Sequence, residues 1–289
     1  MSGGDRVGLA WRDELAAQIV LHLDSIDHLE VIAERELSAS RRRLDALRDL
    51  ACQVSMSLHG VSLGLVSSGS VSEARLERIA RLVERVEPDH WSEHLSFVRA
   101  GRFEIGHLAA APYAPQTLAG ALRNLERARE VVGAMPQLEN IATLLPPPGS
   151  CWTESEFISR VVCGAGAAML LDLHNLYANA CNFGQDPFAI LDSMPLERVA
   201  SVHLSGGHWE NGPDGRSRLI DDHIHDPPLA VYELLEVLAF KAPPPLTVII
   251  ERDGRYPDFA ALLEQIARAR AALAIGRARR REITARQVA

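Results

Sequence analysis

Several features common in other protein classes are scarce in this 289-residue sequence. Its four cysteines are widely spaced and form no C-x-x-C pair, which argues against a disulfide framework and against a thiolate zinc site. We therefore expect all four to be buried, unreactive thiols: Cys52, Cys151, Cys163 and Cys181.

Long hydrophobic runs and a surplus of positive charge are also missing. No stretch approaches the roughly 18 apolar residues that a membrane-spanning helix needs, and the start Met-Ser-Gly-Gly-Asp-Arg lacks the apolar segment of a secretory signal. We expect a cytoplasmic protein without membrane association. The formal net charge is −8, and the basic residues are dispersed except in the tail Arg277-Ala-Arg279-Arg280-Arg281. A nucleic-acid partner is therefore not expected.

No linker rich in Gly, Ser or Pro divides the chain, because the two proline triplets, 146–148 and 243–245, are short and stand between predicted elements. Apolar residues make up 47% and charged residues 24%, as in a globular protein. The length suits one barrel domain of about 250 residues with extensions. We predict a single domain over residues 1–275 and a basic, frayed tail over residues 276–289.

Short apolar runs alternate with segments of helical periodicity, and this alternation predicts a parallel sheet covered by helices. The predicted strands lie near Val7–Ala10, His28–Ile32, Val54–His59, Trp91–Leu95, Gln137–Asn140, Ala168–Asp172, Val199–Leu204 and Thr247–Glu251. The predicted helices lie near Asp13–Leu23, Ser40–Ala51, Val71–Val86, Pro115–Val132, Glu154–Val162, Pro187–Ser193, Leu229–Phe240 and Pro257–Leu273.

Eight such units can form a doubly wound open sheet or a closed (β/α)8 TIM barrel. Their even spacing and the lack of a G-x-G-x-x-G turn favour the barrel. Local signals support two of the helix starts. Thr153 with Glu156 has the pattern of a capping box, and Asp186 before Pro187 is typical of a cap and a first-turn proline.

Metal-ligand side chains follow six successive predicted strands, at the end of the barrel where TIM-barrel active sites lie. They are His59, His94, Glu139, Asp172, His203 and Glu251. A further cluster, Asp221-Asp222-His223-Ile224-His225-Asp226, follows the seventh strand. So many carboxylates and imidazoles on one rim would be unfavourable without cations. A set without thiolates suits iron, manganese or zinc, and its size suggests two or three ions.

Other polar residues near the strands have plainer interpretations. His90 stands at the opposite end of its strand, and His208 is a candidate substrate contact. Glu30 and Glu34 are candidates for supporting contacts, and Glu34 is the better of the two because it lies beyond its strand's carboxyl end. Three more histidines are interpreted as structural: His22, His28 and His107.

Six of these segments, taken in order, resemble a family of multinuclear non-heme iron-dependent oxidative enzymes that includes the iron subunit of methanobactin biosynthesis. The segments are Ser57-Leu58-His59-Gly60-Val61-Ser62-Leu63, Ser92-Glu93-His94-Leu95, Leu138-Glu139-Asn140, Leu171-Asp172-Leu173-His174-Asn175-Leu176-Tyr177, Val202-His203-Leu204-Ser205-Gly206 and Ile250-Glu251. The similarity runs from about Arg6 to Leu273, and no single segment carries it alone.

The resemblance implies a barrel like that of xylose isomerase, with two or three irons. The ligands it implies are His59, His94, Glu139, Asp172, His203 and Glu251, with Glu139 as a bridge. For a third iron it suggests His174, His223 and His225. The chain departs from the family there, because the family often has Asn at the position of His174 and a D-T-H-D run where this chain has residues 222–226.

The activity implied by the resemblance is oxidation of a cysteine, or of another residue near the C-terminus, in a ribosomally made precursor peptide. A mixed Fe(II)/Fe(III) centre would bind the substrate thiolate and O2, and a hydrogen atom would leave the substrate carbon. A small partner protein that recognises the leader peptide is also implied. Two alternatives stay open: a zinc- or manganese-dependent isomerase or phosphoesterase on the same barrel, and a metal-dependent peptide-binding subunit without turnover.

Overall fold

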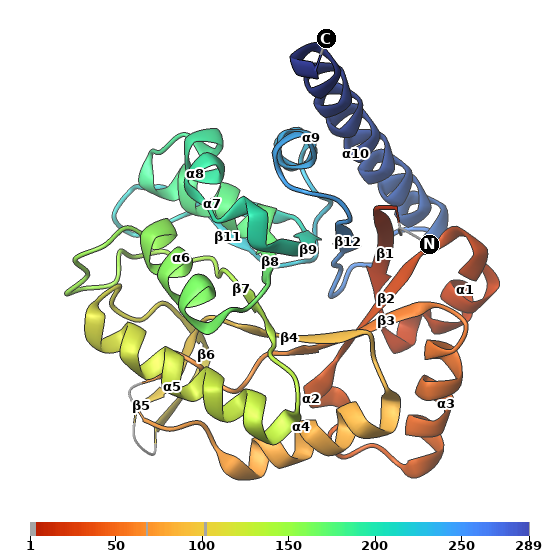
Figure 1. Ribbon diagram of the computed structural model, residues 1–289, viewed down its shortest axis with the longest axis horizontal. Helices are drawn as coiled ribbons and strands as arrows, with labels where there is room; N and C mark the ends of the chain where they lie inside the picture. The colour runs from red at the N-terminus through yellow and green to blue at the C-terminus, as the bar shows by residue number, and fades with distance from the viewer. Residues whose placement is uncertain (1–3, 68, 101–102, 289) are drawn as a thin grey trace.

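Eight parallel strands form a closed barrel in the computed structural model, which describes residues 4–67, 69–100 and 103–288 (Figure 1). Their order around the barrel is β1-β12-β9-β8-β7-β4-β3-β2. The strands are β1 Arg6–Ala10, β2 His28–Ile32, β3 Ser55–Gly60, β4 His90–His94, β7 Gln137–Glu139, β8 Met169–Asp172, β9 Val199–Leu204 and β12 Thr247–Ile250. The predicted (β/α)8 barrel is confirmed. Residues 1–3 of the predicted signal-free start and Ala289 of the predicted tail lie outside the described residues.

Helices surround the barrel and bury the outer face of its strands (Figure 1). They are α1 Ala16–Leu21, α2 Ala33–Glu36, α3 Arg41–Ala51, α4 Glu73–Val86, α5 Pro115–Val132, α6 Glu154–Ala165, α7 Leu173–Phe183, α8 Pro187–Ser193, α9 Leu229–Lys241 and α10 Phe259–Val288. Short 3-10 turns cover Asp13–Leu15, Leu23–Ser25 and Leu196–Arg198. Thr153 and Glu156 form the predicted capping box, and Asp186 caps the helix that begins at Pro187.

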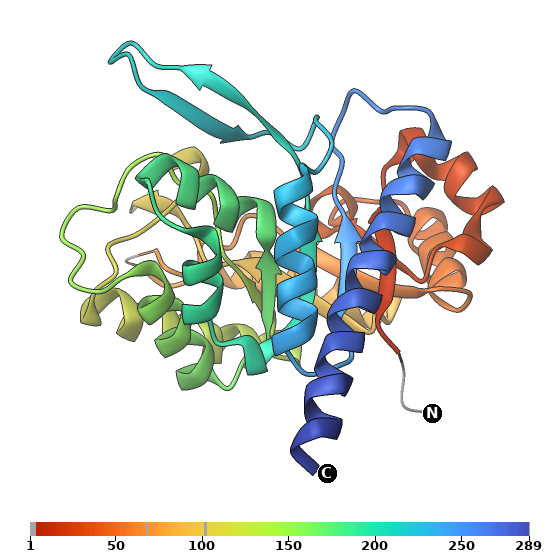
Figure 2. The same cartoon turned by 90° about the horizontal axis from the view of Figure 1, so that it is seen from above.

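Two β-hairpins at the carboxyl end of the barrel were not predicted. The first joins β5 (Phe97–Ala100) to β6 (Phe103–Ala109), and the second joins β10 (Gly207–Asn211) to β11 (Ser217–Asp221). Figure 2 shows the second hairpin projecting from the end of the barrel opposite the two termini. Most of the described residues in these strands are exposed or half-buried. They therefore lack the apolar alternation by which a sequence reveals a strand.

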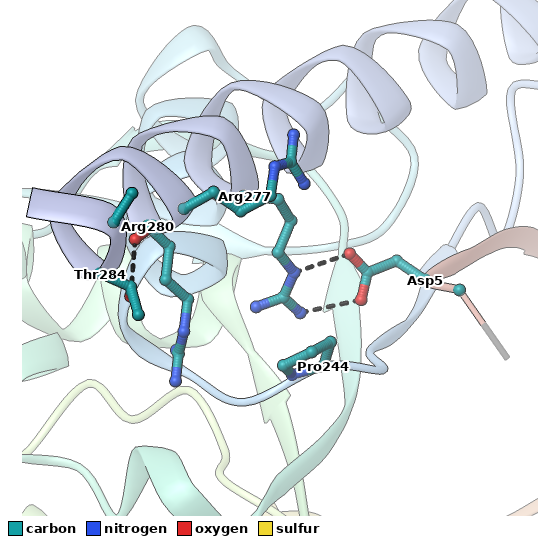
Figure 3. Close-up of a pocket in the computed structure, with 8 residues that line it drawn as sticks. Asp5, Pro244, Arg277, Arg280 and Thr284 are labelled. Carbon is teal, nitrogen blue, oxygen red and sulfur yellow. Dashed lines mark hydrogen bonds and ion pairs between the residues drawn. The ribbon is translucent and has the colours of Figure 1, made fainter. Parts of the chain in front are cut away.

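The C-terminal segment differs from its prediction. The sequence predicted that the last helix ends near Leu273 and that the basic residues after it fray, whereas α10 continues to Val288. Arg277 is buried, and its Nε and Nη2 each donate to a carboxylate oxygen of Asp5 at 2.8 Å (Figure 3). Its Nη1 donates to the carbonyl oxygens of Ala239 and Ala242, at 2.6 Å each. Arg277 therefore anchors α10 to the N-terminal segment and to the end of α9.

A cavity of about 720 Å³ lies beside this anchor, and Figure 3 shows Arg280 and Pro244 on its wall. Arg280 donates to the carbonyl oxygens of Lys241 and Ala242, at 2.7 and 2.6 Å. Cations at a helix C-terminus satisfy carbonyl groups that have no partner within the helix. The basic tail thus stabilises the end of α9.

The prediction that the cysteines are buried is wrong. Cys52, Cys151 and Cys163 are exposed, Cys181 is partly exposed, and all four are free thiols. Cys52 directly follows α3 and Cys163 lies on α6, so both belong to the helical layer outside the barrel rather than to its core. Among the described residues, no helix is both long enough and apolar enough to cross a membrane.

Candidate metal centre

The six side chains that the sequence placed at strand ends converge inside the carboxyl end of the barrel. His59, His94, Glu139, Asp172 and His203 belong to β3, β4, β7, β8 and β9, and Glu251 directly follows β12. All six are buried, with at most 8% of their surface exposed. Parallel strands carry their carboxyl ends to one rim of the barrel, which explains why residues so distant in sequence meet.

The first group of potential ligands is His59, His94 and Glu139. His94 Nδ1 lies 3.2 Å from the Gly60 carbonyl oxygen and must donate to it, so in the neutral ring the lone pair is on Nε2. That Nε2 faces Glu139 Oε2 at 3.2 Å, and His59 Nε2 faces the same oxygen at 3.3 Å. Lone pairs directed at a carboxylate oxygen repel it unless a proton or a cation lies between them.

Two further groups continue from the first. Glu139, Asp172 and His203 form one, and Asp172, His223 and Glu251 form the other, with the ligand atoms of each group within 4.8 Å of one another. Glu139 therefore belongs to the first and second groups, and Asp172 to the second and third. The result is a row of three potential cation positions linked by shared carboxylates.

Charge in this row is strongly unbalanced without cations. Burial and the neighbouring carboxylates of Asp221 and Glu139 raise the pKa of Asp172 well above its ordinary value. Burial alone would raise the pKa of Glu139 too, but the imidazoles of His94, His203 and His59 hold it below its ordinary value. The pKa of Asp172 is raised while that of Glu139 is lowered, which indicates that the two carboxylates compete for the same few positively charged partners.

The row fits metal ions. Glu139 Oε2, Asp172 Oδ2 and His174 Nε2 are buried and have no hydrogen-bond partner within the described part of the chain. Buried polar atoms without partners are costly. All three are atom types that bind iron, manganese or zinc, and a cation bound to each would remove the cost.

Asp221 connects the third position to α7. Its Oδ1 lies 2.8 Å from His174 Nδ1, and its Oδ2 lies 2.8 Å from His223 Nε2. The sequence reasoning proposed His174, His223 and His225 for a third ion. His223 belongs to the third ligand group of the row, and His174 lies beside it through their shared partner Asp221. The polar contacts of His225 are with Asp222, and its ring lies against that of His208.

Several site residues were missed or undervalued from the sequence. Asp221 was noted only as part of a cluster. Glu30 Oε1 lies 2.8 Å from His203 Nε2 inside the barrel, while Glu34 Oε1 accepts from the backbone NH of Val61, so the preference for Glu34 was wrong. The strand period carries the signal that would have found Glu30, because alternate residues of β2 point into the barrel.

A buried cation also lies beside the row. Arg12 Nε donates to Asp253 Oδ1 at 2.7 Å, and Arg12 Nη2 lies 3.5 Å from Glu251 Oε1. Nothing in the sequence distinguished this arginine. It partly neutralises the edge of the row formed by Glu251.

A family model, described as RiPP precursor modification enzyme MbnB/TglH/ChrH, matches residues 6–274. The chain belongs to this family. The MbnB/TglH/ChrH match spans the whole barrel and every residue of the row, in agreement with the resemblance seen in the sequence.

Among relatives of this MbnB/TglH/ChrH member are proteins named only as UPF0276 proteins. One from Caulobacter vibrioides is 32% identical over 252 residues, covering 87% of this chain and 88% of that protein. One from Streptomyces avermitilis is 34% identical over 258 residues, covering 87% of this chain but 51% of its own length. The chain thus spans about half of that relative.

Solved structures share the fold at low sequence identity. An L-ribulose 3-epimerase structure matches with a TM-score of 0.57 and 14% identity, covering 99% of this chain and 98% of the other. A xylose isomerase domain protein from Alicyclobacillus acidocaldarius matches with a TM-score of 0.59 and 16% identity, covering 93% and 99%. Endonuclease IV from Thermus thermophilus matches with a TM-score of 0.54 and 15% identity, covering 94% and 98%. The barrel is therefore xylose isomerase-like.

Proposed function

We propose that this chain is a multinuclear iron enzyme that uses O2 to oxidise a cysteine, or another residue near the C-terminus, of a ribosomally made precursor peptide. The observation that carries the proposal is the row of three ligand groups joined through Glu139 and Asp172 at the mouth of the barrel. A mononuclear enzyme has no need of two shared carboxylates. Membership of a precursor-modifying family supports a peptide substrate.

The chain's own residues would hold the ions in sequence along the row. His59, His94 and Glu139 would hold the first, Glu139, Asp172 and His203 the second, and Asp172, His223 and Glu251 the third. Bound iron, as a mixed Fe(II)/Fe(III) set, would supply the redox chemistry and lower the pKa of a substrate thiol. Ser92 Oγ, 2.8 Å from His59 Nδ1, and the Gly60 carbonyl orient the two imidazoles of the first position.

A cavity of about 650 Å³ opens beside the row, with His94, Asp221 and His223 on its wall. Its other walls come from β6, the segment after β7, and β11, and the apolar part includes Leu108, Ile141, Leu144, Leu145, Pro146 and Leu219. A cavity of this size holds roughly one drug-sized segment. It therefore suits the end of a peptide better than a folded protein, and its apolar lining would exclude water from the reacting group.

Recognition of the leader peptide is a separate question from binding of the peptide's end in the cavity. The described residues form a single barrel and two hairpins, and we assign none of them to leader binding. We propose that a small partner protein recognises the leader and delivers the C-terminal end of the peptide between the hairpins. Dependence of turnover on such a partner would be seen as a large gain in kcat/KM on its addition.

The test begins with protein purified without added metal. We expect more than one iron per chain by elemental analysis. On addition of a synthetic peptide that ends in cysteine, we expect O2 uptake and a mass change in the peptide. Glu139→Gln should abolish the O2 uptake and the mass change in the peptide. Asp89→Asn, a carboxylate at the opposite end of the barrel that pairs with Arg6, is the matched control and should abolish neither.

Other outcomes would favour the alternatives. Zinc or manganese in place of iron, with no O2 uptake, would overturn the oxidase and support an isomerase or phosphoesterase. Peptide binding at full metal occupancy, without any O2-dependent product, would instead support a binding subunit.

A further inference from the structure

A second group of metal-ligand side chains lies outside the buried row, at the base of the β10–β11 hairpin. It consists of His208 on β10 and of Asp222 and His225 in the segment after β11. His208 Nδ1 lies 2.6 Å and His225 Nδ1 lies 2.9 Å from Asp222 Oδ2. We propose that these three side chains bind one divalent transition-metal ion, separate from the ions of the buried centre.

The two sites diverge at adjacent residues. Asp221 contacts His223 of the row and His174 on α7, whereas Asp222 contacts His208 and His225. The ligand atoms of the second group lie within 4.8 Å of one another, and the group shares no residue with the three groups of the row. It is therefore a site of its own and not an extension of the third position.

The position of the Asp222 carboxylate is fixed by the backbone. Its Oδ1 accepts from the NH of Ile224 at 3.0 Å and also lies 3.0 Å from His225 Nδ1, while its Oδ2 faces both imidazoles. One oxygen can accept from both rings only if each carries its proton on Nδ1. A metal ion would replace both protons and bind the two nitrogens and the carboxylate together.

The ligand types and exposure indicate the kind of ion. Two imidazoles and one carboxylate suit Fe²⁺, Zn²⁺, Co²⁺ or Ni²⁺ rather than Ca²⁺ or Mg²⁺. The side chains of His208, Asp222 and His225 are 43%, 14% and 36% exposed, so solvent reaches the site and water can complete the coordination. An ion here would exchange with the solution, unlike ions held by the buried row.

The site also fixes a wall of the substrate cavity. It would tie β10 to the segment that carries His223 and leads to α9, while β11 contributes Leu219 and Asp221 to the cavity. The hairpin base is already closely packed, because a side chain at Gly207 would begin 2.0 Å from the Ile220 carbonyl oxygen. We infer that the ion would hold the hairpin in place over the mouth of the barrel.

The experiment is a titration of the protein, with its buried centre loaded, by Co²⁺ and by Zn²⁺. We expect one further ion per chain, with a Co²⁺ visible spectrum typical of nitrogen and oxygen ligands. His225→Asn and Asp222→Asn should lose this ion, or weaken its binding by more than the roughly tenfold to hundredfold that loss of an outer hydrogen-bond partner costs. Both variants should keep the iron content of the buried centre.

His22→Asn, a histidine at the end of α1, is the matched control and should bind the additional ion as the wild type does. A measurement on the wild type alone guards against misfolded variants: Zn²⁺ should slow amide hydrogen exchange in residues 207–221. The proposal is overturned if the variants bind as many ions as the wild type with equal affinity, or if Zn²⁺ leaves this exchange unchanged. Its failure would not affect the proposed function, because that is read from iron content and O2 uptake.

Discussion

Glu139 and Asp172 stand at the carboxyl ends of the paired strands β7 and β8, and each belongs to two of the three ligand groups. We expect Glu139→Gln to lower the metal content by two ions per chain, since the first and second positions both lose a ligand. His59→Ala should lower it by one, because His59 belongs to a single group. Elemental analysis of the purified variants measures both numbers.

The control for this prediction is Asp89→Asn, which removes a carboxylate charge at the other end of the barrel and should retain the wild-type metal content. A loss of only one ion from Glu139→Gln, as from His59→Ala, would show that the two positions do not share this carboxylate. The linked row would then be wrong as a description of the metal centre.

Much of this geometry could be predicted because a parallel barrel brings all strand ends to one rim. The eight strands could be recognised as apolar runs, and the strand ends alone predicted that His59, His94 and Glu139 lie at the carboxyl rim of the barrel. Loop conformation could not be derived in this way. Asp221 and Asp222 are adjacent in the sequence, and only the fold of the hairpin base directs them to different partners. Asp221 contacts His223 in the row, whereas Asp222 contacts His225 outside it.

Helix α7 shows a second limit. It begins at Leu173 with no intervening turn, and its N-cap is Asp172, whose Oδ1 accepts from the NH of Asn175 at 2.7 Å. The same carboxylate is a potential ligand through Oδ2. From the sequence, Asp172 was interpreted only as a metal ligand, so its second role as the N-cap of α7 was not recognised.

Arg12 should be important for the stability of the metal-free protein. It is 1% exposed, and it contacts Asp253 and Glu251, so Arg12→Met leaves both carboxylates without this partner. Breaking a buried ion pair from one side costs about 3–5 kcal/mol, and the partial exposure of Asp253 reduces this to about 2–4 kcal/mol. Urea denaturation of chelated protein measures the loss of unfolding free energy.

Arg6→Met is the comparison for Arg12→Met. Arg6 pairs with Asp89 at the surface, where both side chains are about half exposed, so the loss should stay below about 1 kcal/mol. Similar losses for the two variants would mean that the buried pair contributes no more than an exposed one.

Arg277 should control the order of the last helical turns. Arg277→Ala removes the contacts with Asp5 and with the carbonyl groups at the end of α9, which should cost about 1–3 kcal/mol. Amide hydrogen exchange over residues 276–286 should become faster. Arg281→Ala alters an exposed arginine on the same helix and should leave the exchange unchanged. Unaltered exchange in Arg277→Ala would contradict the anchoring role.

Glu154 should make stability depend on pH. Burial raises the pKa of its carboxyl to about 7 from an ordinary value of 4.5, although the Asn179 amide that donates to it opposes the rise. The folded chain therefore keeps a proton on this carboxyl that the unfolded chain has lost, so the contribution of Glu154 to stability falls as the pH rises from about 4.5 to about 7 and is constant above that. Glu154→Gln cannot lose a proton. Its unfolding free energy relative to the wild type should rise by about 1–2 kcal/mol between about pH 5 and pH 8, discounted for the partial exposure of the side chain. A difference that stays constant across this range in urea denaturation would place the carboxylate in a well-solvated setting and remove burial as the cause.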